Sequence, residues 1–146
     1  MTTLEIEGYE VDDDPSRVDF EAVWHFLSTE AYWSKWRTRD DVERQVRGAW
    51  RVVGVYEKSS GAQVGFARAL SDGVSEAYLA DVYIGPGHRG RGLSKRLLSL
   101  MCDELPGKNF RWFLSTRDGH GLYEQFGFGP PNDRVMVRPD AFPPSG

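Results

Sequence analysis

The sequence predicts one α/β (α+β) domain, with helices packed on a mixed sheet in the order β-α-α-β-β-β-α-β-α-β. Two observations lead to this fold class. Segments that alternate like strands are interleaved with segments whose apolar residues recur every three or four positions. The length of 146 residues and the hydrophobic content of 40% suit a single domain over residues 1–146. Only the tail, residues 140–146, is expected to be frayed.

The chain is expected to begin with one strand and one helix. Residues 4–11 alternate weakly between apolar and polar side chains, as a strand does. The acidic turn at residues 12–16 offers N-caps, and Phe20, Val23 and Leu27 then mark one face of a helix.

A second, short helix is expected between Thr38 and Gly48. Thr38 followed three residues later by Asp41 is a variant of the capping box, and glycine commonly follows a helix end. Because residues 37–47 are mostly charged, we interpret this run as a solvated helix face.

Three strands are expected in the middle of the chain. Residues 50–57 and 63–70 are rich in Val, Tyr and Phe, and the polar turn at 58–61 indicates an antiparallel hairpin. Residues 76–84 form the third strand of this group.

The last part of the chain is expected to contain two helices and two strands. Apolar residues then recur every fourth position at Leu93, Leu97, Met101 and Leu105, which predicts a helix of three turns. After Pro106 we expect a strand at 111–115, a short helix with Leu122 and Phe126 on one face, and a last strand at 135–137.

The amino-acid composition excludes several classes of partner and binding site. With 18 Lys and Arg against 22 Asp and Glu, the net charge of −4 argues against a nucleic-acid partner or a membrane anchor and favours a cationic small molecule. Cys102 is the single cysteine, which indicates a reducing compartment. His25, His88 and His120 lack metal-ligand spacing, so no metal is expected. Without an apolar span or a signal region, the chain is expected to be cytoplasmic.

A glycine-rich loop leads from the strand at 76–84 into the following helix, and its free N–H groups and the helix dipole predict a phosphate site. The P-loop pattern fails, because Arg91 or Leu93 stands where Lys is required. Gly85, Gly87 and Gly90 spell the dinucleotide fingerprint, but the acidic residue about 20 positions later has no good candidate.

The loop Arg89-Gly90-Arg91-Gly92-Leu93-Ser94 resembles the [RQ]-x-x-G-x-[GA] motif of the GNAT superfamily of acyl-CoA-dependent N-acyltransferases, with Ser94 in place of Gly or Ala. Residues 77–98 as a whole resemble that family. The downstream block at 121–128 does so as well, with Gly119 where Ala is common. The resemblance covers residues 50–128 and implies a mostly antiparallel central sheet with helices on both faces.

The resemblance also implies roles for individual residues. The amides of the loop would hold the pyrophosphate of coenzyme A, and backbone groups near Val82 and Ile84 would pair with pantetheine and face the acyl carbonyl. Tyr123 matches the tyrosine assigned to the coenzyme A sulfur, and Thr116 falls where many members carry an Asn that lines the cofactor.

The chemistry adds two catalytic candidates. A lysine-like amine with a pKa of about 10.4 is neutral in only about one molecule in 2,500 at pH 7, so a base or a chain of waters is expected to take its proton. Asp81 is the first candidate, with Glu76 and His120 as alternatives; the other interpretation of Asp81 is a structural carboxylate that accepts hydrogen bonds. Tyr123 is expected to donate a hydrogen bond to the departing thiolate, or to relay a proton that the product ammonium replaces, rather than to act as a simple acid.

These features predict an N-acetyltransferase that moves an acetyl group from acetyl-CoA directly to a primary amine of a small molecule. Cys102 lies deep in its helix, so a covalent thiol intermediate is not expected. Tyr32, Trp33 and Trp36 are expected to line the acceptor pocket. The alternatives are a non-catalytic coenzyme A sensor and an acetyltransferase acting on protein lysines or N-termini. Edge strands of the sheet would also allow a homodimer.

Overall fold

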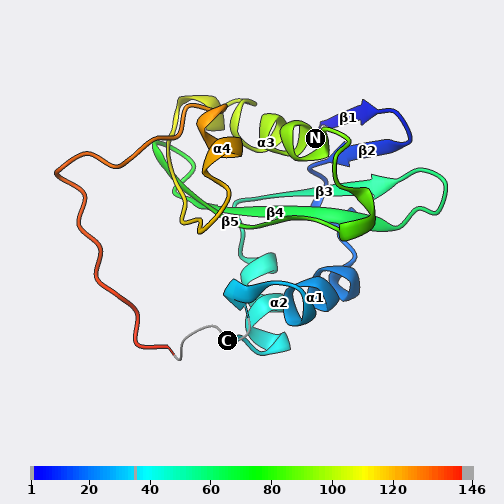
Figure 1. Cartoon of the computed structure of the whole chain (residues 1–146), viewed down its shortest axis with the longest axis horizontal. Coiled ribbons are helices and arrows are strands. Elements are labelled where there is room, and N and C mark those ends of the chain that lie inside the picture. Colours follow the sequence, from blue (N-terminus) through cyan, green and yellow to red (C-terminus); the bar gives the residue numbers. More distant parts are fainter. Residues whose placement is uncertain (1, 35, 143–146) are drawn as a thin grey trace.

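A six-stranded sheet forms the centre of the structure, a computed structural model that describes residues 2–34 and 36–142 (Figure 1). The strands follow the chain in the order β1-β2-β3-β4-β5-β6; the first five are antiparallel to their neighbours, and β6 is parallel to β5. They are β1 (Thr3–Ile6), β2 (Tyr9–Asp12), β3 (Arg51–Glu57), β4 (Gln63–Ser71), β5 (Glu76–Ile84) and β6 (Arg111–Phe113).

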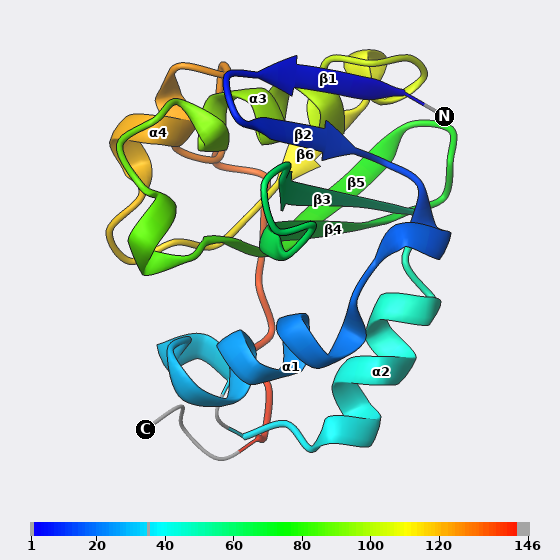
Figure 2. The same cartoon turned by 90° about the vertical axis from the view of Figure 1, so that its right-hand side faces the viewer.

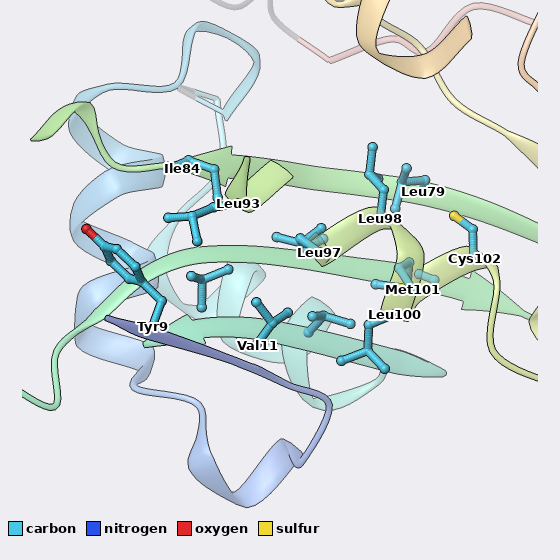
Figure 3. Packing of buried hydrophobic residues seen from close by; sticks show 14 of the residues in the cluster. Tyr9, Val11, Leu79, Ile84, Leu93, Leu97, Leu98, Leu100, Met101 and Cys102 are labelled. Atoms are coloured by element: carbon cyan, nitrogen blue, oxygen red, sulfur yellow. The ribbon is translucent and has the colours of Figure 1, made fainter. Parts of the chain in front are cut away.

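Helices cover both faces of the sheet, as the sequence predicts. Helices α3 (Leu93–Cys102) and α4 (His120–Glu124) lie on one face, and α1 (Phe20–Thr29) and α2 (Arg39–Arg47) lie on the other (Figures 1 and 2). Each face therefore has its own core. Figure 3 shows Leu93, Leu97 and Met101 of α3 packed over the strands, whereas Phe26 and Leu27 of α1 pack on the opposite face with Phe66 and Tyr83.

Local signals in the sequence locate most elements correctly. The hairpin β3–β4, the strand β5 and the helix α2 form where they are expected. The capping box is confirmed, because the Thr38 hydroxyl accepts from the Asp41 amide at 3.1 Å and the Asp41 carboxylate accepts from the Thr38 amide at 2.9 Å. Helix α1 is capped by Asp19 rather than by the acidic turn, where Asp14 instead caps a short 3₁₀ turn.

Two other boundaries differ from the prediction. The expected strand at residues 4–11 is a hairpin of two strands, because Gly8 at φ 83° turns the chain between β1 and β2. Helix α3 ends at Cys102, and Leu105 is exposed. The Arg51 side chain donates to the carbonyl of Met101 at 2.8 Å, which stabilises the helix end there.

The predicted last strand does not form. Residues 129–142 contain no helix or strand; they leave the sheet beside α4 and return toward the face of α1 and α2 (Figures 1 and 2). Met136 and Val137 are almost fully exposed. Pro130, Pro131 and Pro139 lie on either side of them, and proline disfavours pairing in a sheet.

No helix among residues 2–34 and 36–142 has the length and apolar character needed to cross a membrane.

Candidate active site

The site begins where β5 and β6 separate. The two strands pair over three residues only, from Glu76 opposite Arg111 to Tyr78 opposite Phe113. Strand β5 continues to Ile84, but no described strand pairs with it on this side beyond Tyr78. Its N–H and C=O groups there form an open edge, which can hydrogen-bond to an extended, amide-containing ligand.

A β-bulge interrupts β5 on its other side. Phe66 of β4 lies opposite Tyr83 and Arg68 lies opposite Ala80, so Asp81 and Val82 together face one residue of β4. Asp81 has a φ of 55°, in the left-handed region that non-glycine residues rarely adopt. Such a conformation costs on the order of 1–3 kcal/mol and persists only where its surroundings hold it.

The glycine-rich loop after β5 has the conformation expected of an anion site. Gly90 at φ 79° and Gly92 at φ 77° adopt the left-handed region, and Gly92 is the N-cap of α3 without a side-chain cap. Among the described residues, the amides of Leu93, Ser94 and Lys95 have no hydrogen-bond acceptor. Free amides at a helix N-terminus suit the pyrophosphate of coenzyme A.

The two arginines of the loop lie differently. The Arg89 Nε donates to the carbonyl of Ile84 at 3.0 Å, so this side chain fastens the loop to the end of β5. The Arg91 guanidinium lies 6.0 Å from the centre of the Tyr9 ring. Both side chains belong to exposed residues, which leaves their remaining N–H groups accessible to an anion.

A pocket of about 350 Å³ lies beside the open edge of β5. It brings together Asp81 and Tyr123, which the sequence predicts for catalysis, and Tyr32, Trp33 and Trp36, which it predicts for acceptor binding. Val82 and Thr116, which it predicts for cofactor binding, also line the pocket. The glycine-rich loop and Ile84, which the sequence predicts for cofactor binding, lie outside this pocket. Neither Glu76 nor His120, the alternative bases, lines this pocket, and Glu76 instead pairs with Arg111.

Asp81 is buried in the wall of this pocket, and four N–H groups bind its carboxylate. Trp33 Nε1 donates to Oδ1 at 2.9 Å, and Arg68 Nε donates to Oδ2 at 2.6 Å. Arg37 binds both oxygens, at 2.8 Å through Nη2 and 2.9 Å through Nη1. Burial alone would raise the pKa of Asp81, but the hydrogen bonds and charges of the two arginines outweigh it and hold that pKa below its usual value.

This environment argues against Asp81 as the general base. Both oxygens are already used as acceptors, and a lowered pKa makes the carboxylate a weaker base. The geometry matches the other interpretation, a structural carboxylate that accepts hydrogen bonds from arginine. It also explains how the left-handed backbone at the bulge is held.

Tyr123 is half-buried in α4, where its ring packs edge-on against Phe128 at 5.9 Å. Its hydroxyl forms no hydrogen bond with any described residue, although the residue lines the pocket. Burial raises the pKa of Tyr123 to about 12, so the hydroxyl stays protonated at neutral pH and can act as a donor. Thr116 supports this helix, because its Oγ1 accepts from the Gly119 amide at 2.9 Å.

Three aromatic residues that follow α1 also line the pocket: Tyr32, Trp33 and Trp36. Tyr32 packs edge-on against Trp33 at 5.1 Å, and the guanidinium of Arg117 lies 3.7 Å from the centre of the Tyr32 ring. Trp36 stacks on Phe142 from the C-terminal segment, with ring centres 4.3 Å apart. Trp33 is fixed by its hydrogen bond to Asp81, so the chain that follows α1 is attached to the sheet at the bulge.

Two residues of the site were missed by the sequence analysis. Arg37 is buried, which corrects the interpretation of residues 37–47 as a solvated face; within α2 itself, Val42 is also buried. Arg68 is also buried, on β4. A charged side chain between the apolar residues of a central strand was the available signal, because such a charge needs a buried partner.

The thiol of Cys102 lies outside the pocket. Cys102, the last residue of α3, is buried in the core, and burial raises the pKa of its thiol to about 12 (Figure 3). It therefore remains a neutral thiol that does not line the pocket. Over residues 2–34 and 36–142, no three His, Cys, Asp or Glu side chains group in a way that could hold a metal ion.

An open strand edge that leads from a loop with free amides to a small pocket suits an acyltransferase. Comparison with known families agrees with this class. The chain belongs to the acetyltransferase (GNAT) family, whose sequence profile matches residues 7–128.

Individual relatives support the family. The crystal structure of a candidate GNAT-family acetyltransferase from Xanthomonas campestris pv. campestris is 35% identical, covers 90% of this chain and 93% of its own, and has a TM-score of 0.83. A candidate acetyltransferase of Gibberella zeae is 32% identical over 87 residues, 60% of this chain and 47% of its own length. Serotonin N-acetyltransferase 2 of Oryza sativa subsp. japonica, a chloroplastic protein, is 34% identical over 80 residues, 53% of this chain and 40% of its own. The chain thus spans less than half the length of these two curated relatives.

Proposed function

We propose that this protein transfers an acetyl group from acetyl-CoA directly to a primary amine of a small molecule. One observation carries the proposal: the free amides of the loop and the open edge of β5 lead to the pocket where the Tyr123 hydroxyl has no other partner. The name of the rice relative, a serotonin N-acetyltransferase, adds support for a small amine as the acceptor.

Each part of the site has a task in this proposal. The amides of Leu93, Ser94 and Lys95 bind the pyrophosphate of acetyl-CoA, and the edge of β5 beyond Tyr78 pairs with the amides of its pantetheine arm. Bound acetyl-CoA supplies an activated acyl group as a thioester. A backbone N–H near Val82, at the bulge, donates to the acyl oxygen as negative charge develops on it.

Tyr123 stabilises the departing sulfur as a hydrogen-bond donor. Its pKa of about 12 lies about 3.5 units above that of a thiol, so complete proton transfer to the thiolate would be uphill by about 5 kcal/mol. A hydrogen bond needs no such transfer. Because Asp81 is saturated with donors, we assign it a positioning role, and the acceptor amine loses its proton to water in the open pocket.

Two measurements test the proposal together. Calorimetric titration should detect binding of coenzyme A and acetyl-CoA, and thiol release should then rise when primary amines are added. Gly92→Val should lose most of the affinity, because a β-branched residue is strained at φ 77°. Gly61→Val is the matched control: Gly61 has a φ of 73° and open space around it, in the turn between β3 and β4.

The outcomes separate the alternatives. Binding that is lost in Gly92→Val but kept in Gly61→Val, with amine-dependent thiol release, supports the transferase. Binding without any release above background would instead indicate a coenzyme A sensor. Release that requires a peptide lysine or N-terminus would indicate a protein acetyltransferase.

A further inference from the structure

Two buried arginines and one buried carboxylate lie together in the wall of the pocket around Asp81. The side chains of Arg37, Arg68 and Asp81 are only 3%, 7% and 2% exposed, so water screens them weakly. Arg68 shares the carboxylate of Asp81 with Arg37. The overall negative charge of the chain therefore does not describe the immediate surroundings of Arg68.

Arg68 has hydrogen-bonding capacity to spare. Its Nε donates to Asp81 at 2.6 Å, and its Nη1 and Nη2 donate to no described residue. A guanidinium carries five N–H groups, and buried donors in proteins are almost always paired. Because Arg68 lines the pocket, these free N–H groups are available to a molecule bound there. Two neighbouring N–H donors on a planar group match the two oxygens of a carboxylate.

The other charges at the pocket do not offset this cluster. Asp118 also lines the pocket and Arg117 packs over Tyr32, but both residues are exposed and opposite in charge. Exposed charges are screened by solvent and salt, so they contribute less to the field on a bound molecule. Arg68 is therefore the buried cation of the pocket whose N–H groups are available to an anion.

We infer that Arg68 binds a carboxylate of the acceptor, so that the acceptor is an amino acid or a similar small molecule with both an amine and a carboxylate. This inference rests on the proposed function. A pocket of about 350 Å³ has room for such a molecule, with its carboxylate at Arg68 on β4 and its amine on the side of Tyr123 in α4. Asp81 then acts as a positioning residue that orients the Arg68 guanidinium.

Matched pairs of amines test the inference. Phenylalanine is compared with 2-phenylethylamine, and 4-aminobutyrate with propylamine, by thiol release from acetyl-CoA. The wild-type protein should favour the carboxylate-bearing member of at least one pair by tenfold or more in kcat/KM. A charge-assisted hydrogen bond is worth about 1.5–3 kcal/mol, so Arg68→Gln should reduce that preference by a factor of about 10 to 150.

Two further variants sharpen the test. Arg68→Lys keeps the positive charge but has only one nitrogen to share between Asp81 and the ligand, so it should restore part of the preference. Arg44→Gln removes a charge from the exposed side of α2 and should leave the preference unchanged. An equal preference in Arg68→Gln and wild type, or a wild-type preference for the amine without the carboxylate in both pairs, would overturn the inference.

Other readouts keep the inference testable if a variant does not fold or no amine is acetylated. With an active wild-type protein, 3-phenylpropionate should compete with the amine and 3-phenylpropionamide should not. If no amine is acetylated, the proposed function fails, and titration of the protein with 3-phenylpropionate still tests the subsite. Saturable binding that weakens about tenfold or more in Arg68→Gln supports it, whereas no binding to the wild-type protein contradicts it.

Discussion

Asp81 carries several functions of the site in one side chain. It holds the left-handed backbone of the bulge, fixes Trp33 and orients two arginines. The sequence correctly places this carboxylate on a strand, next to the predicted acyl site. Two roles, general base and structural carboxylate, are compatible with that position. Only the arrangement of Arg37 and Arg68, from distant parts of the chain, decides between them.

Asp81→Asn should destabilise the protein strongly. The substitution keeps the size of the side chain but removes the negative charge that two buried guanidinium groups bind, and removing one partner of a buried pair costs about 3–5 kcal/mol. Urea unfolding measures the loss. Asp133→Asn, in the exposed C-terminal segment, is the control and should change the free energy of unfolding by less than about 0.5 kcal/mol.

The pH dependence gives this prediction a second readout. The folded-state pKa of Asp81 lies below its unfolded value of about 3.9, so its contribution to stability is fully present above the unfolded pKa. It is lost as the pH falls through the folded-state pKa. The difference in the free energy of unfolding between wild type and Asp81→Asn should therefore stay constant from neutral pH to about pH 5 and decrease below about pH 4. If this difference in the free energy of unfolding disappeared near pH 7, the result would contradict the lowered pKa of Asp81.

Tyr123→Phe should lower turnover far more than coenzyme A affinity. Removing one donor to a developing negative charge typically costs about 10²-fold in kcat, whereas the phenyl ring keeps its packing against Phe128. Thiol release gives the rate, and calorimetry gives the affinity. Tyr78→Phe, which removes a hydroxyl that donates to Ser115 at 3.2 Å, should have a much smaller effect. Equal turnover in wild type and Tyr123→Phe would remove the proposed role.

At the scale of elements, the sequence locates those that depend on local signals. The capping box of α2 and the polar turn between β3 and β4 involve residues a few positions apart, so they can be recognised from the sequence alone. The bulge in β5 and the early end of its pairing with β6 depend on the register of neighbouring strands. The predicted strand at 135–137 fails for the same reason: its run of apolar residues is present, but no described strand pairs with it.

The start of α4 supports a prediction about a single methyl group. A Cβ at Gly119 would lie 2.9 Å from Thr116 Oγ1 and 3.0 Å from Tyr123 Cε2, both too close. Gly119→Ala should therefore displace the Tyr123 ring, lower turnover several-fold and destabilise the protein by about 1–3 kcal/mol.

Gly121→Ala is the matched control in the same helix. A Cβ at Gly121 has no neighbour within 4 Å, and alanine favours helix over glycine. Thermal unfolding and thiol release on both variants give the comparison. Unchanged turnover in Gly119→Ala would show that the position of the Tyr123 ring does not limit the reaction.

At the scale of the whole molecule, the site lies where the two layers of helices meet across the edge of the sheet. The glycine-rich loop and α4 belong to one layer, and Tyr32, Trp33, Trp36 and Arg37 follow α1 on the other (Figure 1). These four residues are far from residues 114–123 in sequence, so their meeting at one pocket depends on the global fold. The GNAT-like motifs can be recognised in the sequence because they are local, whereas the pairing of Arg37 and Arg68 with Asp81 cannot.

The C-terminal segment connects the same two layers, and this leads to the last prediction. Phe142 stacks on Trp36, a residue that lines the pocket, at the end of a segment that leaves the sheet beside α4 (Figures 1 and 2). An aromatic pair is worth about 0.5–1.5 kcal/mol beyond the area that it buries. Phe142→Ala should therefore loosen Trp36 and raise the KM for the amine by about two- to tenfold, with a smaller change in kcat.

Met136→Ala provides the control for this variant. Met136 lies in the same segment but is 93% exposed, so its loss should change neither the KM nor the tryptophan emission. In Phe142→Ala, the emission should shift to longer wavelength, because Trp36 gains contact with water when its stacking partner is removed. A raised KM together with this shift means that the C-terminal segment completes the acceptor pocket from outside the sheet. If the two variants behave alike in both measurements, the stack on Trp36 contributes nothing to acceptor binding, and the pocket is complete without the segment.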